Sequence, residues 1–436
     1  MPSLDRTLFR AVFLTPQTGR VSLSRRHFAP LLLAVIVVGA LGCREDAESP
    51  TGPQSEPALA TAQAVAALAL RQVSTGGRHT CGVATDNRAY CWGGNTYGQL
   101  GIGSTLDRSR PVAVARGLRF TQVSAGSHHT CGVTTDSSIY CWGLNDNGQL
   151  GNSSLTPRVR PVLVKGGLRF TQVDAGDFHT CAVTTENRAY CWGNNRGELG
   201  DGTTSDRLRP AAVAGARRFR RVSAGQGYSC GVTLADKAFC WGDNTWGQLG
   251  TGTRDPEDAA LPVHRKPVAV AGGLSFRTVV AGDGVHTCGV TTDDRAYCWG
   301  FGGQGGLGEG TSTINLTATA VAGGLSFRHV VAALFRTCGV TTGDRAYCWG
   351  DNFTGAIGDG TTTLRRTPVA VLGGLRFRGV STSGNHTCGV TTDNRAYCWG
   401  DNRYGQLGAG TTTGPETCFS IDWPCSTKPK AVIGPS

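Results

Sequence analysis

The chain has 436 residues, with 64 glycines, 17 cysteines and a single methionine. This length would allow about two or three ordinary domains, but internal repeats fill residues 70–436 without a break, so we expect one closed domain there. The formal net charge is +11, and removal of residues 1–42 leaves 37 basic and 30 acidic residues, a net charge of +7. Because the basic residues recur beside acidic ones in each repeat, we expect a mixed, solvated surface and no nucleic-acid partner.

The N-terminal segment has the proportions of an export signal. Arginines precede an apolar run at residues 31–41 that is too short to cross a bilayer. The run ends in Gly-Ala-Leu-Gly before Cys43, which resembles a bacterial lipobox; the alternative is an ordinary signal peptide with an incidental cysteine. We therefore expect a signal peptide over residues 1–42 and lipidation at Cys43. If sorting follows the usual lipoprotein pattern, Arg44 in place of aspartate implies delivery to the outer membrane.

Two features near the N-terminus stay open. Residues 24–28 resemble the twin-arginine export motif, although the many cysteines that need oxidation outside the cytosol favour the general secretory route. A start at Val21 is also compatible with the signal. Residues 43–69 begin with a polar, proline-containing stretch without periodicity, which predicts a flexible tether.

The stretch HTCGVTTDNRAYCWG at residues 386–400 recurs in close copies six more times. Each copy carries two cysteines with nine residues between them, and the first cysteines are spaced by 50, 50, 49, 58, 50 and 50 residues. A period near fifty that contains several short β-like runs predicts an all-β, seven-bladed propeller with one blade per repeat.

Each repeat offers four candidate strands. In the second copy these are Leu118–Ser124, His129–Thr134, Ile139–Trp142 and Pro161–Val164, bounded by Gly-rich or Asp/Asn-containing turns. We expect them to form one four-stranded antiparallel blade.

Paired spacing without a zinc-type pattern indicates disulfides and an oxidising compartment. If Cys131 and Cys141 lie opposite one another in a hairpin, Gly132 faces Tyr140, and the turn is centred on Asp136. The expected bonds join the following pairs: Cys81 and Cys91, Cys131 and Cys141, Cys181 and Cys191, Cys230 and Cys240, Cys288 and Cys298, Cys338 and Cys348, Cys388 and Cys398, and, in a separate small loop, Cys418 and Cys425.

The two ends of the repeat region suggest how the ring closes. The first repeat begins at an inner strand, Leu70–Ser74, and the chain ends with a copy of the outer strand near residues 428–433. We expect this C-terminal strand to complete the first blade as a latch. The alternative is that each outer strand belongs to the blade before it in sequence, without a latch.

The repeated run HTCGVTTDxRAYCWGDNxxGQLGxGT, followed by PVAVAGG, resembles the regulator of chromosome condensation (alpha-tubulin suppressor-like) repeat family, in the cysteine-paired form of secreted bacterial members. The resemblance covers residues 70–436 and implies seven-bladed propellers. The founding member of that family is a guanine-nucleotide exchange factor that binds a small GTPase and chromatin. We do not expect that activity in an exported chain, because only Asp177 and Asp283 supply acids at the loops that would make such contacts.

Sequence differences among the copies locate a candidate binding surface. The turns between the second and third strands and between repeats are nearly uniform, whereas the loops between the first and second strands differ, and both long insertions, residues 253–264 and 411–427, fall between the third and fourth strands. In an antiparallel blade these variable segments share one face, where recognition would be placed; the alternative is drift on an unused surface. The candidate binding residues are Arg78, His128, Asp177, Phe178, Gln226, Asp283, Leu334, Phe335, Asn385 and Trp423. Trp246, also aromatic, replaces a repeat tyrosine and is expected to pack in the core.

The histidine of the HTC motif is expected to form structural hydrogen bonds and not to bind metal, because two copies have Tyr228 and Arg336 there instead. No nucleophile, metal or paired-acid motif stands out, so we expect no enzyme activity, no cofactor and no metal; a hydrolase or lyase is the minority alternative. The sequence therefore predicts a monomeric, lipid-anchored binding module of the bacterial cell envelope that recognises an unidentified protein or glycan. An adhesive or structural envelope component is the competing class.

Overall fold

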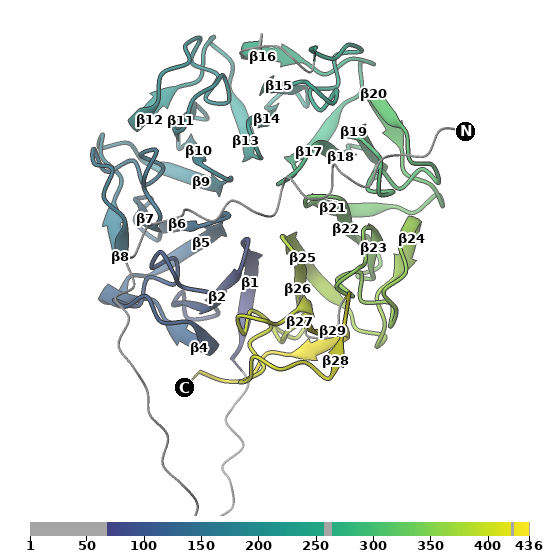
Figure 1. Ribbon diagram of the computed structural model, residues 1–436. Helices are drawn as coiled ribbons and strands as arrows, with labels where there is room; N and C mark the ends of the chain where they lie inside the picture. Colours follow the sequence, from purple (N-terminus) through teal and green to yellow (C-terminus); the bar gives the residue numbers. More distant parts are fainter. Residues whose placement is uncertain (1–67, 257–263, 420–422, 436) are drawn as a thin grey trace, which may run out of the picture. The chain divides into compact units, whose positions relative to one another are not determined.

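The computed structural model describes residues 68–256, 264–419 and 423–435, in which seven antiparallel sheets surround a central axis (Figure 1). Six sheets have four strands and the last has five. The described residues contain no helix apart from one short 3-10 turn, η1 (Ala115–Gly117). The predicted seven-bladed propeller is confirmed. The expected signal peptide, most of the tether and Cys43 lie outside the described residues.

Within six blades the strands follow the chain from the axis outward, and in the seventh β28 (Glu416–Thr417) lies outside β29 (Pro424–Ala431) (Figure 1). The innermost strands are β1 (Leu70–Thr75), β5 (Phe120–Ala125), β9 (Phe170–Ala175), β13 (Phe219–Ala224), β17 (Phe276–Ala281), β21 (Phe327–Ala332) and β25 (Phe377–Ser383). The second strands are β2 (His79–Ala84), β6 (His129–Thr134), β10 (His179–Thr184), β14 (Tyr228–Thr233), β18 (His286–Thr291), β22 (Arg336–Thr341) and β26 (His386–Thr391). The third strands are β3 (Ala89–Gly93), β7 (Ile139–Gly143), β11 (Ala189–Gly193), β15 (Ala238–Gly242), β19 (Ala296–Phe301), β23 (Ala346–Gly350) and β27 (Ala396–Asp401). The outer strands are β4 (Arg108–Ala113), β8 (Arg158–Leu163), β12 (Arg207–Ala212), β16 (His264–Ala269), β20 (Ile314–Ala320), β24 (Arg365–Ala370) and β29 (Pro424–Ala431), beyond which lies β28 (Glu416–Thr417).

The hairpin between the second and third strands has the predicted register. Cys131 pairs with Cys141 and Gly132 with Tyr140. The two cysteine Cα atoms lie 4.1 Å apart and the disulfide is formed, as are the other seven expected bonds. Position 132 requires glycine because a Cβ there would lie 2.6 Å from the Phe120 ring of the inner strand.

The hydrophobic core lies between blades. Trp142 of the second blade packs against Cys81 and Val83 of the first, and its indole nitrogen donates a hydrogen bond of 2.8 Å to the Gln99 carbonyl there. Equivalent tryptophans occupy the other junctions and are fully buried. Because each blade places its tryptophan in the neighbouring blade, a single blade cannot bury its apolar surface alone.

The predicted latch is wrong. The C-terminal strand β29 pairs with β27 in the seventh blade, and the first blade takes its outer strand, β4, from its own repeat. The ring closes through the Leu70 backbone nitrogen, which donates to the Asn394 carbonyl at 2.9 Å, and through Val432, which packs with Leu70 and Trp92. The junction between the first two blades has the same kind of bond, from the Phe120 nitrogen to the Asn87 carbonyl. Since every repeat already holds four strands, none is left to exchange.

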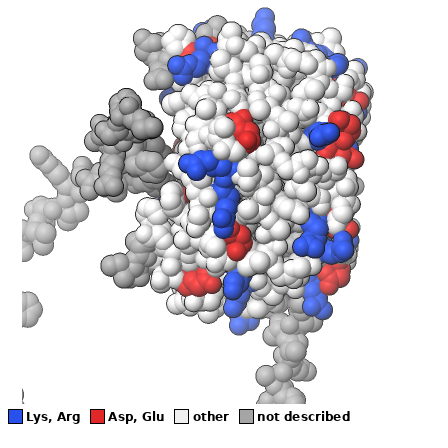
Figure 2. All heavy atoms as spheres, turned by 90° about the vertical axis from the view of Figure 1, so that its right-hand side faces the viewer, with Lys and Arg blue, Asp and Glu red and all other residues white. Residues whose placement is uncertain are grey.

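The two faces of the propeller have different roles. We call the surface formed by the segments between first and second strands and between third and fourth strands the loop face, and the opposite surface the turn face. On the turn face, the residue after the centre of each hairpin has positive φ, for example 65° at Ser137, and its carbonyl binds the next blade. Lys and Arg side chains lie interspersed with Asp and Glu over the side of the molecule drawn in Figure 2, as expected for a mixed surface.

Candidate binding face

The loops of each blade support one another on the loop face. The carbonyl of the last residue before the second strand accepts a backbone hydrogen bond from the start of the third-to-fourth segment. In the first blade the Gly94 backbone nitrogen donates to the Arg78 carbonyl at 2.7 Å. In the sixth blade the Asp351 nitrogen donates to the Phe335 carbonyl at 3.0 Å. This bond recurs in all seven blades, so the variable residues stand on a uniform backbone frame.

All ten predicted binding residues lie on the loop face: Trp423 precedes β29, and the other nine lie between first and second strands. Arg78, Phe178 and Gln226 are exposed, and the others are partly buried. The structure brings Asp177, Phe178 and Gln226 together around one hollow. Their role in binding stays a prediction.

Two aromatic clusters extend over the loop face. In the first, the Trp246 and Phe301 rings lie 4.9 Å apart and Phe301 lies 6.0 Å from Phe335. Trp246 is half-buried within this surface cluster, so the expectation that it packs in the core is wrong.

The second cluster lies in the sixth and seventh blades. Phe419 lies 5.7 Å from Phe353 and 5.6 Å from Trp423, and the Arg403 guanidinium sits 3.3 Å from the centre of a Trp423 ring. Cys418, next to Phe419, is bonded to Cys425, so the predicted disulfide loop is confirmed and anchors this cluster.

Sequence reasoning missed Phe301, Phe353 and Phe419. Phe301 stands where other copies have Gly, Leu, Asn or Asp, so comparison of the third-to-fourth segments could have found it. Among the described residues the aromatic side chains with the largest exposed fractions are Tyr97 (39%), Phe178 (39%), Phe353 (37%) and Phe419 (68%). All four lie on the loop face.

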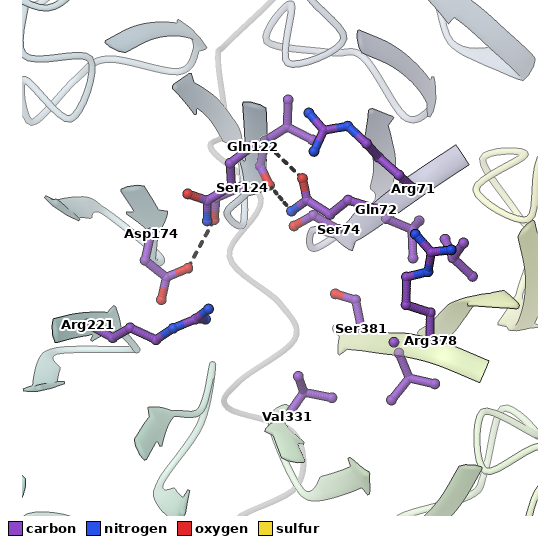
Figure 3. Close-up of a pocket in the computed structure, with 15 residues that line it drawn as sticks. Arg71, Gln72, Ser74, Gln122, Ser124, Asp174, Arg221, Val331, Arg378 and Ser381 are labelled. Atoms are coloured by element: carbon purple, nitrogen blue, oxygen red, sulfur yellow. Dashed lines mark hydrogen bonds between the residues drawn. The ribbon is translucent and has the colours of Figure 1, made fainter. Parts of the chain in front are cut away.

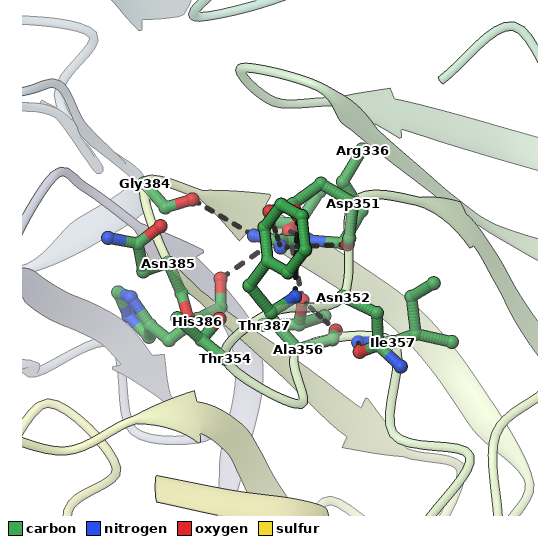
Figure 4. Close-up of polar contacts among 12 residues, drawn as sticks. Arg336, Asp351, Asn352, Thr354, Ala356, Ile357, Gly384, Asn385, His386 and Thr387 are labelled. Carbon is green, nitrogen blue, oxygen red and sulfur yellow. Dashed lines mark hydrogen bonds and ion pairs between the residues drawn. The ribbon is translucent and has the colours of Figure 1, made fainter. Parts of the chain in front are cut away.

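Arg336 replaces the repeat histidine in the sixth blade and is 1% exposed (Figure 4). Its guanidinium donates to Thr382 Oγ1 at 3.2 Å and to the Gly384 carbonyl at 2.9 Å, both in the seventh blade. The Asp351 carboxylate lies 3.8 Å away. Burial lowers the pKa of Arg336, and Asp351 opposes that shift. The side chain therefore joins two blades and is not available to a ligand.

The histidines of the HTC motif form a buried ring of contacts between blades. Each Nε2 atom lies 2.7–2.8 Å from a Thr or Ser hydroxyl of the next blade, as for His79 and Thr130. Tyr228 takes this place in the fourth blade by donating to the His286 carbonyl at 2.6 Å. Burial lowers the pKa of His79, His129, His179 and His386 to about 3 and that of His286 to about 4. The predicted structural role is confirmed.

Asp283 lies on the loop face, between β17 and β18. Its carboxylate accepts a hydrogen bond from Ser383 of the seventh blade, so it links two blades that are not neighbours. Burial raises the pKa of Asp283 to about 7, and the nearby charges of Asp177 and Asp174 add to the rise.

The central channel is lined by the inner strands and holds a pocket of about 340 Å³ (Figure 3). Glutamine side chains form pairs of hydrogen bonds with the next blade there. The Gln72 side chain donates to the Val123 carbonyl at 2.8 Å and accepts from the Val123 nitrogen at 3.0 Å. Arg221 and Asp174 point into the same space (Figure 3). The Asp174 carboxylate accepts from Ser124 Oγ and from the Ala224 nitrogen, each at 3.0 Å. The polar side chains of the channel therefore mainly hold the blades together.

No group of three or more His, Cys, Asp or Glu side chains in the described residues could hold a metal ion. None of their helices has the length and apolar character needed to cross a membrane.

Comparison with known proteins now identifies the family. Residues 37–335 match the RCC1-like domain, and residues 377–406 and 393–436 match the regulator of chromosome condensation (RCC1) repeat. The chain belongs to the RCC1-like domain family. Among curated proteins, the ultraviolet-B receptor UVR8 of Arabidopsis thaliana is 44% identical over 45 residues, which is 10% of each protein.

Solved structures of other proteins share the fold. Human WBSCR16 is similar to this chain with a TM-score of 0.66 and 19% identity, over 73% of this chain and 85% of that one. Prp20p of Saccharomyces cerevisiae is similar to this chain with a TM-score of 0.68 and 19% identity, over 80% of this chain and 87% of Prp20p. Yeast RCC1 (Prp20) in its complex with Kap60 has a TM-score of 0.67 and 19% identity, over 79% of this chain and 83% of the yeast chain. Identities this low establish the propeller architecture alone.

Proposed function

We propose that this protein is a lipid-anchored component of the bacterial cell envelope whose RCC1-like propeller binds another protein through the loop face. The proposal rests on one observation above all: the four most exposed described aromatic side chains, Tyr97, Phe178, Phe353 and Phe419, share the face on which the repeats differ. Aromatic side chains supply much of the energy of protein interfaces when a partner buries them. The turn face, in contrast, repeats nearly the same residues in every blade.

Binding in place of catalysis is the function that the site chemistry supports. Asp283 and His286, which lie near the loop face, are engaged in contacts between blades. The guanine-nucleotide exchange activity of the founding member of the family is not part of the proposal.

The test compares loop-face and turn-face variants of the full chain. A partner is first captured from an envelope extract. Replacement of Phe178, Phe353 and Phe419 by Ala should weaken its binding by at least tenfold, because each substitution removes an exposed aromatic side chain that the partner would bury. Affinity is measured with the purified partner by calorimetry. The matched control replaces exposed leucines of the turn face, Leu234 and Leu372, by Ala and should bind like wild type. Equal affinity of the aromatic variant and wild type would contradict the proposal.

The proposed envelope location is supported by the cysteines. Sixteen of the 17 cysteines form eight disulfides, which requires an oxidising compartment, and Cys43 of the lipobox-like sequence is the remaining one. The wild-type chain expressed in bacteria should incorporate labelled palmitate and sediment with membranes, whereas Cys43→Ser should do neither. Incorporation of label by both forms, or by neither, would refute lipidation at this residue.

A further inference from the structure

A hollow of about 410 Å³ opens on the loop face of the third blade. Both variable segments of this blade contribute to it, together with loops of the two neighbouring blades. Its lining includes Asn147, Asp177, Phe178, Asn194, Arg196, Glu198, Gln226 and Gly227.

Glu198 is the unusual residue of this hollow. It is 2% exposed, and it stands where four other repeats have glutamine: Gln99, Gln149, Gln248 and Gln406. The glutamine side chain caps its own turn, as when Gln99 Oε1 accepts from the Tyr97 nitrogen at 2.9 Å. Glu198 accepts the equivalent bond from the Arg196 nitrogen and a second from the Asn194 side chain. Gly306 and Ala356 occupy this position in two further repeats, whose turns form without a side-chain oxygen. The turn therefore does not need the negative charge of Glu198.

Three other carboxylates at or after the ends of third strands have little exposed side-chain surface and pair with an arginine. Asp201 pairs with Arg207 at 2.8 Å, Asp359 with Arg365 at 2.7 Å and Asp401 with Arg403 at 3.0 Å. Within the described part of the chain Glu198 forms no ion pair.

The environment of Glu198 disfavours its charge. Burial raises the pKa of Glu198, although its hydrogen bonds and the charge of Arg196, whose side chain is exposed, oppose the rise. A buried carboxylate without a counterion is costly, so a cation entering the hollow would be favoured.

Two of the remaining walls, Asp177 and Phe178, suit a cation on an apolar stem, although the exposed Arg196 side chain also lines the hollow. Asp177 provides a second carboxylate, held by the Gln226 side-chain nitrogen at 3.5 Å, and Phe178 presents a ring that is 39% exposed. A guanidinium or ammonium group can interact with carboxylates while its alkyl chain packs on an aromatic face. A neutral or anionic group would leave Glu198 without compensation.

We propose that this hollow binds an arginine or lysine side chain of the partner protein, with the cationic group at Glu198 and Asp177 and the stem against Phe178. The proposal rests on the protein-binding function above and adds the chemistry that the partner must present.

The test uses short peptides, so it does not require the partner. Acetylated, amidated Gly-Gly-X-Gly-Gly with X as Arg, Lys or norleucine is passed over the immobilised full chain, and equilibrium affinity is measured by surface plasmon resonance. The Arg and Lys peptides should bind saturably, with dissociation constants on the order of 1 mM, and the norleucine peptide at least tenfold more weakly. Glu198→Gln should weaken the Arg and Lys peptides about tenfold or more while leaving the fold intact, because four other blades carry glutamine at this position.

The matched control is Glu186→Gln, the same change at an exposed residue of the turn face, which should bind all three peptides like wild type. Equal affinity for the norleucine and Arg peptides, equal affinity of Glu198→Gln and wild type, or no saturable binding of either cationic peptide would overturn the assignment. The peptide measurements do not use the aromatic variants. The cation-binding proposal can therefore be refuted while the loop face is still shown to bind a partner. Loss of the loop-face effect with intact peptide binding would refute only the wider function.

Discussion

At the scale of single residues, the repeat histidines are structural because of what surrounds them. His129 is completely buried, and its Nε2 atom lies 2.8 Å from the Thr180 hydroxyl of the next blade. The sequence indicated this role, since Tyr228 and Arg336 occupy the same position in other copies and could not complete a ring of metal ligands. It could not reveal the partner, because the hydroxyl belongs to a different repeat.

These histidines predict a stability that depends on pH. Their pKa values in the folded protein, about 3 to 4, lie below the unfolded value near 6.5, so the unfolded chain binds more protons between these limits. Their contribution to stability is complete above pH 6.5 and is lost as the pH falls toward 3. The free energy of unfolding should decrease by up to about 1.4 kcal/mol per pH unit for each histidine. Asp283, whose pKa is raised to about 7, opposes this trend between pH 3.8 and 7, and Asp174 and Glu198, whose pKa values are also raised, act in the same direction. These three carboxyl groups are outnumbered by the five histidines and by His329, whose pKa is lowered to about 4.

Urea denaturation at pH 7.5 and pH 5.0 would measure the effect, and the free energy of unfolding should be smaller at pH 5.0. His179→Gln should make the pH dependence smaller by the share of one histidine, because glutamine stays neutral. Unfolding free energies that are equal at the two pH values would show that these histidines keep the same protonation in the folded and unfolded chain.

At the scale of the blade, the sequence predicted the central hairpin better than the outer strand. The hairpin register follows from the spacing of Cys131 and Cys141, since directly opposed positions suit a disulfide. The outer strand was expected at Pro161–Val164 but spans Arg158–Leu163. Its pairing with β7 shifts between Cys141 and Gly143, and no periodicity in the sequence marks such an irregularity.

At the scale of the whole molecule, the closing junction is equivalent to the other six and is not a special clasp. Val432 follows β29 and packs between the last and first blades, as Val114 packs between the first and second. The backbone nitrogens of both valines donate to the first residue of the third strand of their own blade. A latch would instead have required a strand shared by the two ends.

Because the junctions are equivalent, the same substitution at two of them should lower the free energy of unfolding by a similar amount. Val432→Ala and Val114→Ala each remove two buried carbon atoms at a blade interface and should each lower the free energy of unfolding by about 1 to 3 kcal/mol. Both variants are compared with wild type by urea denaturation. A cost for Val432→Ala several times that for Val114→Ala would restore a special closing role for the end of the chain.

The number of blades, the hairpin register, the disulfides and the face on which the copies differ could all be predicted from the sequence. These features are repeated, and each depends on local spacing within about fifty residues. The strand that closes the ring, the aromatic rings that meet on the loop face and the burial of Glu198 without a cationic partner became known only from the folded chain. These contacts join different repeats or separate loops, so their geometry depends on how the blades pack around the axis.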